Sequence, residues 1–204
     1  MNIVFDFGGV LLRWVPHEVV SQVLPARTPS AEAAHALVAD FFQNFTGDWQ
    51  AFDRGTIEPG PLAQRIAART GLALDEAHAV IDAIPHALVP VPGTVALLER
   101  LHAAGRPLYY LSNMPAPFAD HLEANRPFMG LFRQGVFSAR VRLVKPEREI
   151  FDHAVAAFGI DPANSLFIDD FEHNVEAARA AGWQALHFRD PEQCAADLEA
   201  MGLV

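Results

Sequence analysis

The chain has 204 residues, of which 51% are hydrophobic and 20% are charged, so it can bury a substantial core and does not have the composition of a disordered protein. Its formal net charge of −10 disfavours nucleic acid and anionic membrane surfaces as partners, and its single cysteine excludes an intramolecular disulfide and a cysteine metal cluster. The N-terminus lacks the pattern of a signal peptide, and no apolar run approaches the roughly 18 residues of a membrane span, so we expect a cytoplasmic protein.

The first predicted element is a buried strand over residues 2–5. It delivers Asp6 to a glycine turn at Gly8 and Gly9. The next segment, residues 15–90, has helical periodicity and no convincing strand, which predicts an insertion of about four helices. We expect residues 1–14 and 91–204 to form a core domain and residues 15–90 to form an inserted helical cap domain.

Beyond the insertion, short apolar runs alternate with helical patterns. Strands are predicted over residues 107–111, 135–137, 165–168 and 184–188, and helices over residues 91–104, 118–125, 147–158, 172–181 and 191–201. This alternation predicts an α/β fold, with a doubly wound, Rossmann-like parallel sheet that is covered by helices on both faces.

Polar residues stand where the predicted strands end. Asp6, Ser112-Asn113 and Asp169-Asp170 each follow a strand, and Lys145 opens a helix nearby. Ligands of open α/β sheets bind outside the carboxyl ends of the strands, so these side chains should converge on a metal-bound oxyanion. Each residue alone also has an ordinary structural interpretation, as a helix cap or as chain punctuation, and for Ser112 and Lys145 taken singly we favour that interpretation. The paired carboxylates of Asp169 and Asp170, however, repel each other unless a cation or capping amides compensate them.

The order of these motifs resembles that of the haloacid dehalogenase superfamily over essentially the whole chain. The four motifs are FDFGGVL at residues 5–11, LSN at 111–113, KP at 145–146 and FIDDFEHN at 167–174. The helical insertion resembles the small cap of the subgroup (subfamily IA, variant 3) that contains sugar phosphatases and 2-haloacid dehalogenases. Within it, the first, third and fourth motifs are similar to those of the branch that contains α-glucose-1-phosphate phosphatase.

The resemblance implies a magnesium-dependent phosphohydrolase that acts on a small phosphorylated metabolite. Asp6 would be the nucleophile and would form an aspartyl-phosphate that water later hydrolyses. Mg²⁺ would be held by Asp6, the backbone carbonyl of Gly8 and Asp170, with Asp169 binding directly or through water. The resemblance leaves the oligomeric state open between a monomer and a homodimer.

The remaining motif residues have implied roles around the transferring phosphoryl group. Ser112 and the backbone amide of Asn113 would bind its oxygens, and Lys145 would neutralise their charge and keep Asp6 ionised. Asn174 would orient either Lys145 or an outer carboxylate, although a solvated helix residue is an almost equally good interpretation.

The chain departs from the usual phosphatases of the superfamily at Gly8. Those enzymes carry a second Asp at this position, which protonates the leaving alkoxide and then activates water. General acid–base catalysis typically contributes about 10² to 10⁴-fold, so alkyl phosphates should be slow substrates unless the leaving group is good or another residue supplies the proton. The candidates for such a donor are His17, Asp48, Asp53 and His86, and the sequence does not rank them.

The cap is dense in aromatic residues between positions 41 and 55. Phe41, Phe45 and Phe52 have the spacing of a small hydrophobic core within the cap. We interpret Trp49, together with Asp48 and Asp53, as a substrate-binding wall, because aromatic faces and carboxylates suit a polyol such as a sugar phosphate.

Two other functions remain open at this point. A metal-independent 2-haloacid dehalogenase resembles the fold and also lacks the second acid, and Arg54 could supply its cap arginine; the Asp169-Asp170 pair argues against it. A catalytically weakened relative that only binds a phosphorylated metabolite is supported by Gly8 alone.

Overall fold

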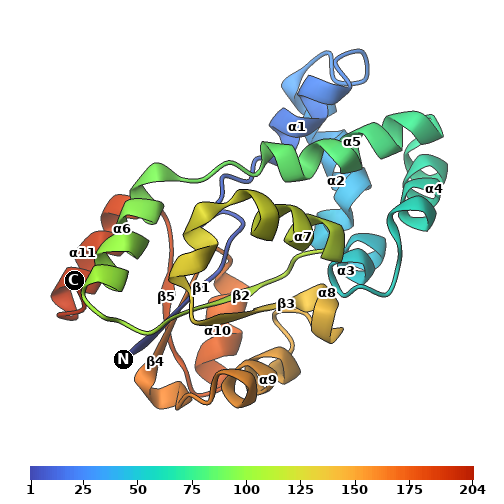
Figure 1. The fold of residues 1–204 in the computed structure, drawn as a ribbon. Coiled ribbons are helices and arrows are strands. Elements are labelled where there is room, and N and C mark those ends of the chain that lie inside the picture. Colours follow the sequence, from blue (N-terminus) through green and yellow to red (C-terminus); the bar gives the residue numbers. More distant parts are fainter.

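A computed structural model describes residues 1–204 and contains a five-stranded parallel sheet (Figure 1). The strands are β1 (Asn2–Phe5), β2 (Leu108–Ser112), β3 (Gln134–Phe137), β4 (Ser165–Asp169) and β5 (Gln184–His187). Their order in the sheet is β3-β2-β1-β4-β5, and every neighbouring pair is parallel. The predicted α/β doubly wound fold is confirmed.

Helices cover both faces of the sheet, because alternate residues of each strand point to opposite sides. Ile3 and Phe5 belong to the apolar cluster that α6, α7 and α11 cover, whereas Val4 belongs to the cluster under α9 and α10. The bounds of the helices that follow the cap are α6 (Pro92–Ala103), α7 (Ala116–Asn125), η2 (Pro127–Leu131), α8 (Ser138–Val141), α9 (Arg148–Phe158), η3 (Pro162–Asn164), α10 (Glu172–Ala180) and α11 (Pro191–Ala200).

The segment predicted as the cap, residues 15–90, contains helices and no named strand, and it lies to one side of the sheet in Figure 1. Its elements are α1 (Pro16–Val23), α2 (Ala31–Phe42), η1 (Gln43–Phe45), α3 (Gly47–Asp53), α4 (Pro59–Thr70) and α5 (Leu74–Ala87). Five α-helices therefore stand where about four were expected, because the short α3 is a separate helix.

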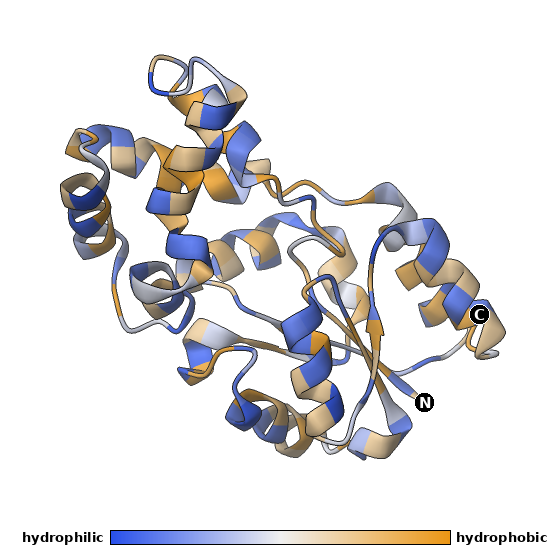
Figure 2. Ribbon diagram, turned by 180° about the vertical axis from the view of Figure 1, so that it is seen from behind, coloured by the Kyte–Doolittle hydropathy of each residue, from blue (hydrophilic) through white to orange (hydrophobic).

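Local sequence signals explain where the cap helices begin and end. The Ser30 hydroxyl accepts a hydrogen bond from the Ala33 amide at the start of α2, and Gly71 ends α4 in the left-handed conformation with φ of 72°. Hydrophobic and hydrophilic residues alternate along the helices in Figure 2, as expected for helices that bury one face in the core. None of the helices has the length and apolar character needed to cross a membrane.

The strand order places β1 at the centre of the sheet. From β1 the chain builds outward on one side through β2 and β3, and then returns to build β4 and β5 on the other side. This reversal is the topological switch point at which open α/β sheets form their ligand crevice. The carboxyl ends of β1, β2 and β4 meet there.

Candidate active site

The switch point brings the predicted motif residues together. Asp6 directly follows β1, while Ser112 and Asp169 are the last residues of β2 and β4. Lys145 comes from the segment between α8 and α9, and all four side chains are buried. The fold therefore gathers two carboxylates, a hydroxyl and an ammonium group from residues that lie up to 163 positions apart in the chain.

Lys145 is the central cation of this cluster. Its Nζ lies 2.8 Å from Asp6 Oδ1 and 2.6 Å from Asp169 Oδ2. The contact with Asp169 is a hydrogen bond, whereas the contact with Asp6 is an ion pair that lacks hydrogen-bond geometry. Burial alone would lower the pKa of Lys145, but the two carboxylates outweigh it and raise that pKa above its usual value. Lys145 is thus a permanent positive charge beside Asp6.

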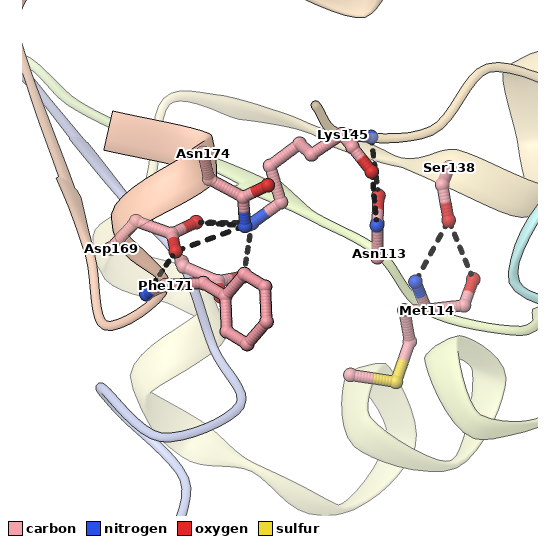
Figure 3. Close-up of polar contacts among 8 residues, drawn as sticks. Asn113, Met114, Ser138, Lys145, Asp169, Phe171 and Asn174 are labelled. Carbon is pink, nitrogen blue, oxygen red and sulfur yellow. Dashed lines mark hydrogen bonds and ion pairs between the residues drawn. The ribbon is translucent and has the colours of Figure 1, made fainter. Parts of the chain in front are cut away.

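Asp169 is fully buried and its two oxygens are occupied by protein donors (Figure 3). Besides Lys145, the Phe171 amide donates to Oδ1 at 2.8 Å, and the Asn174 side chain donates to Oδ1 and Oδ2 at 3.0 and 3.1 Å. Of the two partners expected for Asn174, the structure shows the carboxylate. Asp169 consequently orients Lys145 and has little capacity left for a direct metal bond.

Asp170 differs from Asp169 in both position and partners. Its carboxylate lies directly against Gly9, where a Cβ would meet Asp170 Oδ2 at 2.1 Å. The side chain is exposed on one side, and no other side chain donates a hydrogen bond to it. Partial burial, reinforced by repulsion from Asp6 and Asp169, raises the pKa of Asp170 to about 7.

The three acids together form a centre that fits a divalent cation. Ligand oxygens of Asp6, Asp169 and Asp170 lie within 4.8 Å of one another. Burial raises the pKa of Asp6 to about 6; Lys145 opposes this increase, and Asp169 adds to it. One ammonium group faces three carboxylates, so an additional cation with a preference for oxygen ligands would relieve the repulsion.

Asn113 holds the Lys145 segment in place through its side chain (Figure 3). Its Oδ1 accepts from the Lys145 amide at 2.8 Å, and its Nδ2 donates to the Lys145 carbonyl at 2.9 Å. Sequence reasoning considered only the backbone of Asn113 and missed this contact. The two bonds fix the third motif beside the end of β2.

The interpretation of Trp49 as a substrate-binding wall is wrong. Trp49 is 4% exposed, and its ring packs on Phe42 at 4.5 Å and on Phe52 at 5.6 Å between ring centroids. Its aromatic surface is therefore used in a hydrophobic core that is continuous from the cap to the sheet, and not in a separate core of the cap. Phe41 and Phe52 are buried in it, whereas Phe45, expected in the core as well, is 37% exposed.

Two further cap residues are engaged by other side chains. Asp48, assigned to the same wall, is paired with Arg65 at 2.7 Å and Arg69 at 2.9 Å, and the hydrogen bond from Arg65 lowers its pKa. Arg54, the candidate for a dehalogenase cap arginine, forms a two-pronged ion pair with Glu147, with distances of 2.8 and 2.5 Å. Neither side chain is free to bind a ligand as expected.

Gly8 leaves space on the nucleophile side of the site. A Cβ at this position would meet only the Trp14 Cβ, at 4.0 Å, and the backbone does not have the positive φ that Gly9 has. The glycine is therefore not required here by backbone conformation.

The comparisons with known proteins agree with this geometry. A model of the haloacid dehalogenase-like hydrolases matches residues 1–182. The chain belongs to this family. It is thus a hydrolase, and the resemblance drawn from the four motifs is confirmed.

The similar proteins include relatives that are named for two different activities. The chain is 28% identical to the sesquiterpene phosphatase astK of Aspergillus oryzae, over 92% of this chain and 89% of the relative. It is 26% identical to an (S)-2-haloacid dehalogenase of Pseudomonas putida, over 89% and 81%. A solved structure of a family enzyme from Bacteroides thetaiotaomicron, in complex with magnesium and inorganic phosphate, superposes with a TM-score of 0.72 at 25% identity, over 92% of this chain and 93% of that one.

Proposed function

We propose that the protein is a magnesium-dependent phosphohydrolase that cleaves a small organic phosphate monoester through an aspartyl-phosphate on Asp6. The observation that carries the proposal is the cluster of Asp6, Asp169 and Asp170 around the single buried cation Lys145. The phosphatase activity named for astK, and the magnesium and phosphate bound to the Bacteroides enzyme, support the same chemistry.

The metal would be held by Asp6, Asp170 and the backbone carbonyl of Gly8, because these oxygens are not engaged as those of Asp169 are. When bound, Mg²⁺ supplies positive charge that offsets the negative charge of the phosphoryl oxygens and of the acids. Asp169 does not bind the metal directly in this proposal; it holds Lys145 in place through their hydrogen bond.

The protein residues then have separate tasks in the reaction. Asp6 attacks phosphorus with one carboxylate oxygen, and Lys145, 2.8 Å away, keeps that carboxylate ionised. Ser112 and the amide of Asn113 would bind the phosphoryl oxygens from the end of β2, where they stabilise the charge of the transition state. Water then hydrolyses the aspartyl-phosphate.

A metal-independent dehalogenase is less well supported by the site. Such an enzyme has no use for the Asp170 carboxylate beside Asp6 and Asp169. Burial, together with repulsion from these two acids, raises the pKa of Asp170 to about 7. In addition, the guanidinium group of Arg54 is already paired with Glu147. The 26% identity to the Pseudomonas dehalogenase is no higher than the 28% identity to the phosphatase astK.

The test measures phosphate release from p-nitrophenyl phosphate and acetyl phosphate, whose leaving groups need little protonation. We expect turnover with Mg²⁺, none after chelation, and mass-spectrometric capture of phosphate on Asp6 in acid-quenched protein. Asp6→Asn should abolish both signals, whereas Asp82→Asn, at an exposed acid of α5, should leave them unchanged.

Retention of more than a few per cent of activity in Asp6→Asn would remove Asp6 as the nucleophile. Metal-independent chloride release from 2-chloropropionate without phosphate release would favour the dehalogenase instead. A screen of phosphorylated metabolites with Mg²⁺ would then identify the substrate.

A further inference from the structure

The absence of a carboxylate at position 8 leaves the leaving oxygen without an obvious proton donor. Three of the four candidates have other partners in the structure. Asp48 is paired with two arginines; His17 stacks on His35 at 5.1 Å between ring centroids, and His86 lies 4.8 Å from His121, edge to face. The fourth, Asp53, has a different environment.

The backbone of Asp53 is fixed to the core domain beside the phosphate-binding motif. Asp53 is the last residue of α3, and its carbonyl accepts a hydrogen bond of 2.5 Å from the Ser138 hydroxyl. The Ser138 oxygen also accepts from the Met114 amide at 2.8 Å (Figure 3). Met114 comes two residues after Ser112, so a single buried hydroxyl joins the end of α3 to the end of β2.

The residues that follow Asp53 are fixed as well. Arg54 pairs with Glu147, which comes two residues after Lys145. At Gly55, where φ is +72°, a Cβ would lie 2.5 Å from the Ala139 carbonyl oxygen, so the backbones of the cap and the core are in close contact there. Asp53 is thus held between the second and third motifs.

The Asp53 carboxyl group is buried and has no partner. The residue is 8% exposed, and no hydrogen bond or ion pair engages its carboxyl oxygens, although its carbonyl is bonded to Ser138. The charged groups that act on it are Lys145 and Asp6. Burial raises the pKa of Asp53 to about 8; Lys145 opposes this increase, and Asp6 adds to it. At neutral pH the group is therefore a carboxylic acid, and its backbone is held through Ser138 beside the end of β2, from which Ser112 comes.

We propose that Asp53 of the cap is the catalytic acid that protonates the leaving oxygen, in place of the carboxylate that is absent at position 8. This inference rests on the proposed phosphohydrolase function. The four-motif pattern does not include Asp53, because it lies in the cap, 47 residues after Asp6.

The proton and electron balance of both steps is complete with Asp53 as the donor. As an Asp6 oxygen bonds to phosphorus, the bond between phosphorus and the leaving oxygen breaks, and its electron pair is protonated by the Asp53 acid to release an alcohol. The Asp53 carboxylate then takes a proton from water, whose oxygen attacks phosphorus. The bond from phosphorus to Asp6 breaks, phosphate is released, Asp6 regains its carboxylate, and Asp53 is again an acid.

The experiment compares phosphate esters with different leaving groups, with Mg²⁺ present: glycerol 2-phosphate, phenyl phosphate and 2,4-dinitrophenyl phosphate. Asp53→Asn, which preserves shape, should reduce alkyl ester turnover about 10² to 10⁴-fold and affect the dinitrophenyl ester little, because that leaving group needs no proton. The matched control is Asp48→Asn on the same helix, which should not change the dependence on the leaving group.

A second variant tests for rescue. Because position 8 has free space and no positive φ, Gly8→Asp should restore alkyl ester turnover to the Asp53→Asn protein and reduce its dependence on the leaving group. This rescue distinguishes a lost proton donor from a displaced cap, which a carboxylate at position 8 would not repair.

The outcomes separate this inference from the function on which it rests. If the unmodified protein turns over no phosphate ester with Mg²⁺, including the dinitrophenyl ester, the proposed function fails. If it does turn them over, an equal loss across all esters in Asp53→Asn, or unchanged alkyl ester turnover, overturns the role of Asp53. A steep dependence on leaving-group pKa in the unmodified protein would overturn it as well, even if the variant failed to fold.

Discussion

Asp169 and Asp170 are adjacent in sequence, yet the fold gives them opposite tasks. Asp169 is completely buried and receives hydrogen bonds from Lys145, Asn174 and the Phe171 amide. Asp170 is exposed on one side and rests on Gly9 without such donors. The first is therefore built to support the lysine, and the second is available to a cation.

This contrast predicts different effects of two conservative substitutions. Asp170→Asn should raise the Mg²⁺ concentration for half-maximal activity by more than tenfold, and it should not destabilise the metal-free protein, because it removes a charge that Asp6 and Asp169 repel. Asp169→Asn should lower the free energy of unfolding by about 3 kcal/mol, because it removes one partner of a buried ion pair. Metal titration and urea unfolding measure the two effects, and equal responses in both assays would contradict the assignment.

The residues of the acidic centre could be predicted because each one follows a strand, and the carboxyl ends of parallel strands share one edge. The cap residues could not be placed in the same way. Helical periodicity predicts which residues are apolar neighbours, but it does not distinguish a buried Trp49 from an exposed Phe45. Gln43, Asn44 and Phe45 all have positive φ, and this left-handed turn brings Phe45 to the surface.

At the scale of elements, the decisive contact is the one between α3 and the start of α8. The Ser138 hydroxyl donates to the Asp53 carbonyl and accepts from the Met114 amide, so it connects the cap to the end of β2. Ser138 also follows a predicted strand, which was the available signal for a role at the site. Its partner in the cap could not be predicted, because long-range docking is not encoded in local periodicity.

Ser138→Ala is expected to act on both stability and chemistry. It leaves the buried Met114 amide without its acceptor, which should cost about 1 to 3 kcal/mol of folding free energy. It should also make turnover depend more steeply on the leaving group, because Asp53 loses its anchor. The control is Ser30→Ala, which removes the cap of α2 at a cost of about 1 kcal/mol. An equal change of the leaving-group dependence in the control would contradict the role of Ser138.

For the molecule as a whole, the acidic site makes metal-free stability depend on pH. The pKa values of Asp6, Asp170 and Asp53 are raised to about 6, 7 and 8, whereas unfolded Asp titrates near 4. Between these values the folded state holds more protons than the unfolded state, so the stability contributed by these groups is lost as pH rises.

The melting temperature of chelated protein should accordingly fall between about pH 5 and pH 8, and Asp53→Asn should reduce this slope. Magnesium should raise the melting temperature more at the upper end of the range, where the site carries its full negative charge. Thermal unfolding with and without Mg²⁺ measures both effects, and a slope that is the same in Asp53→Asn would contradict the raised pKa of Asp53.

The sheet and its helices could be predicted almost to the residue, since alternating apolar runs and helical patterns determine the layers. The number of cap helices could not, because the seven residues of α3 are too few to show their own period. The position of α3 against α8 is a property of the assembled molecule, and it decides which part of the cap lies next to the end of β2.

Two contacts attach the end of α3 to the core: the hydrogen bond from Ser138 to Asp53 and the ion pair of Arg54 with Glu147. Of these, the ion pair is the one that is exposed to solvent and dissolved salt. Its side chains are 26% and 38% exposed, whereas Ser138 is fully buried. Dissolved ions weaken attractions between partly exposed charges and hardly affect buried hydrogen bonds. A higher ionic strength therefore weakens the Arg54–Glu147 ion pair but leaves the hydrogen bond from Ser138 to Asp53 intact.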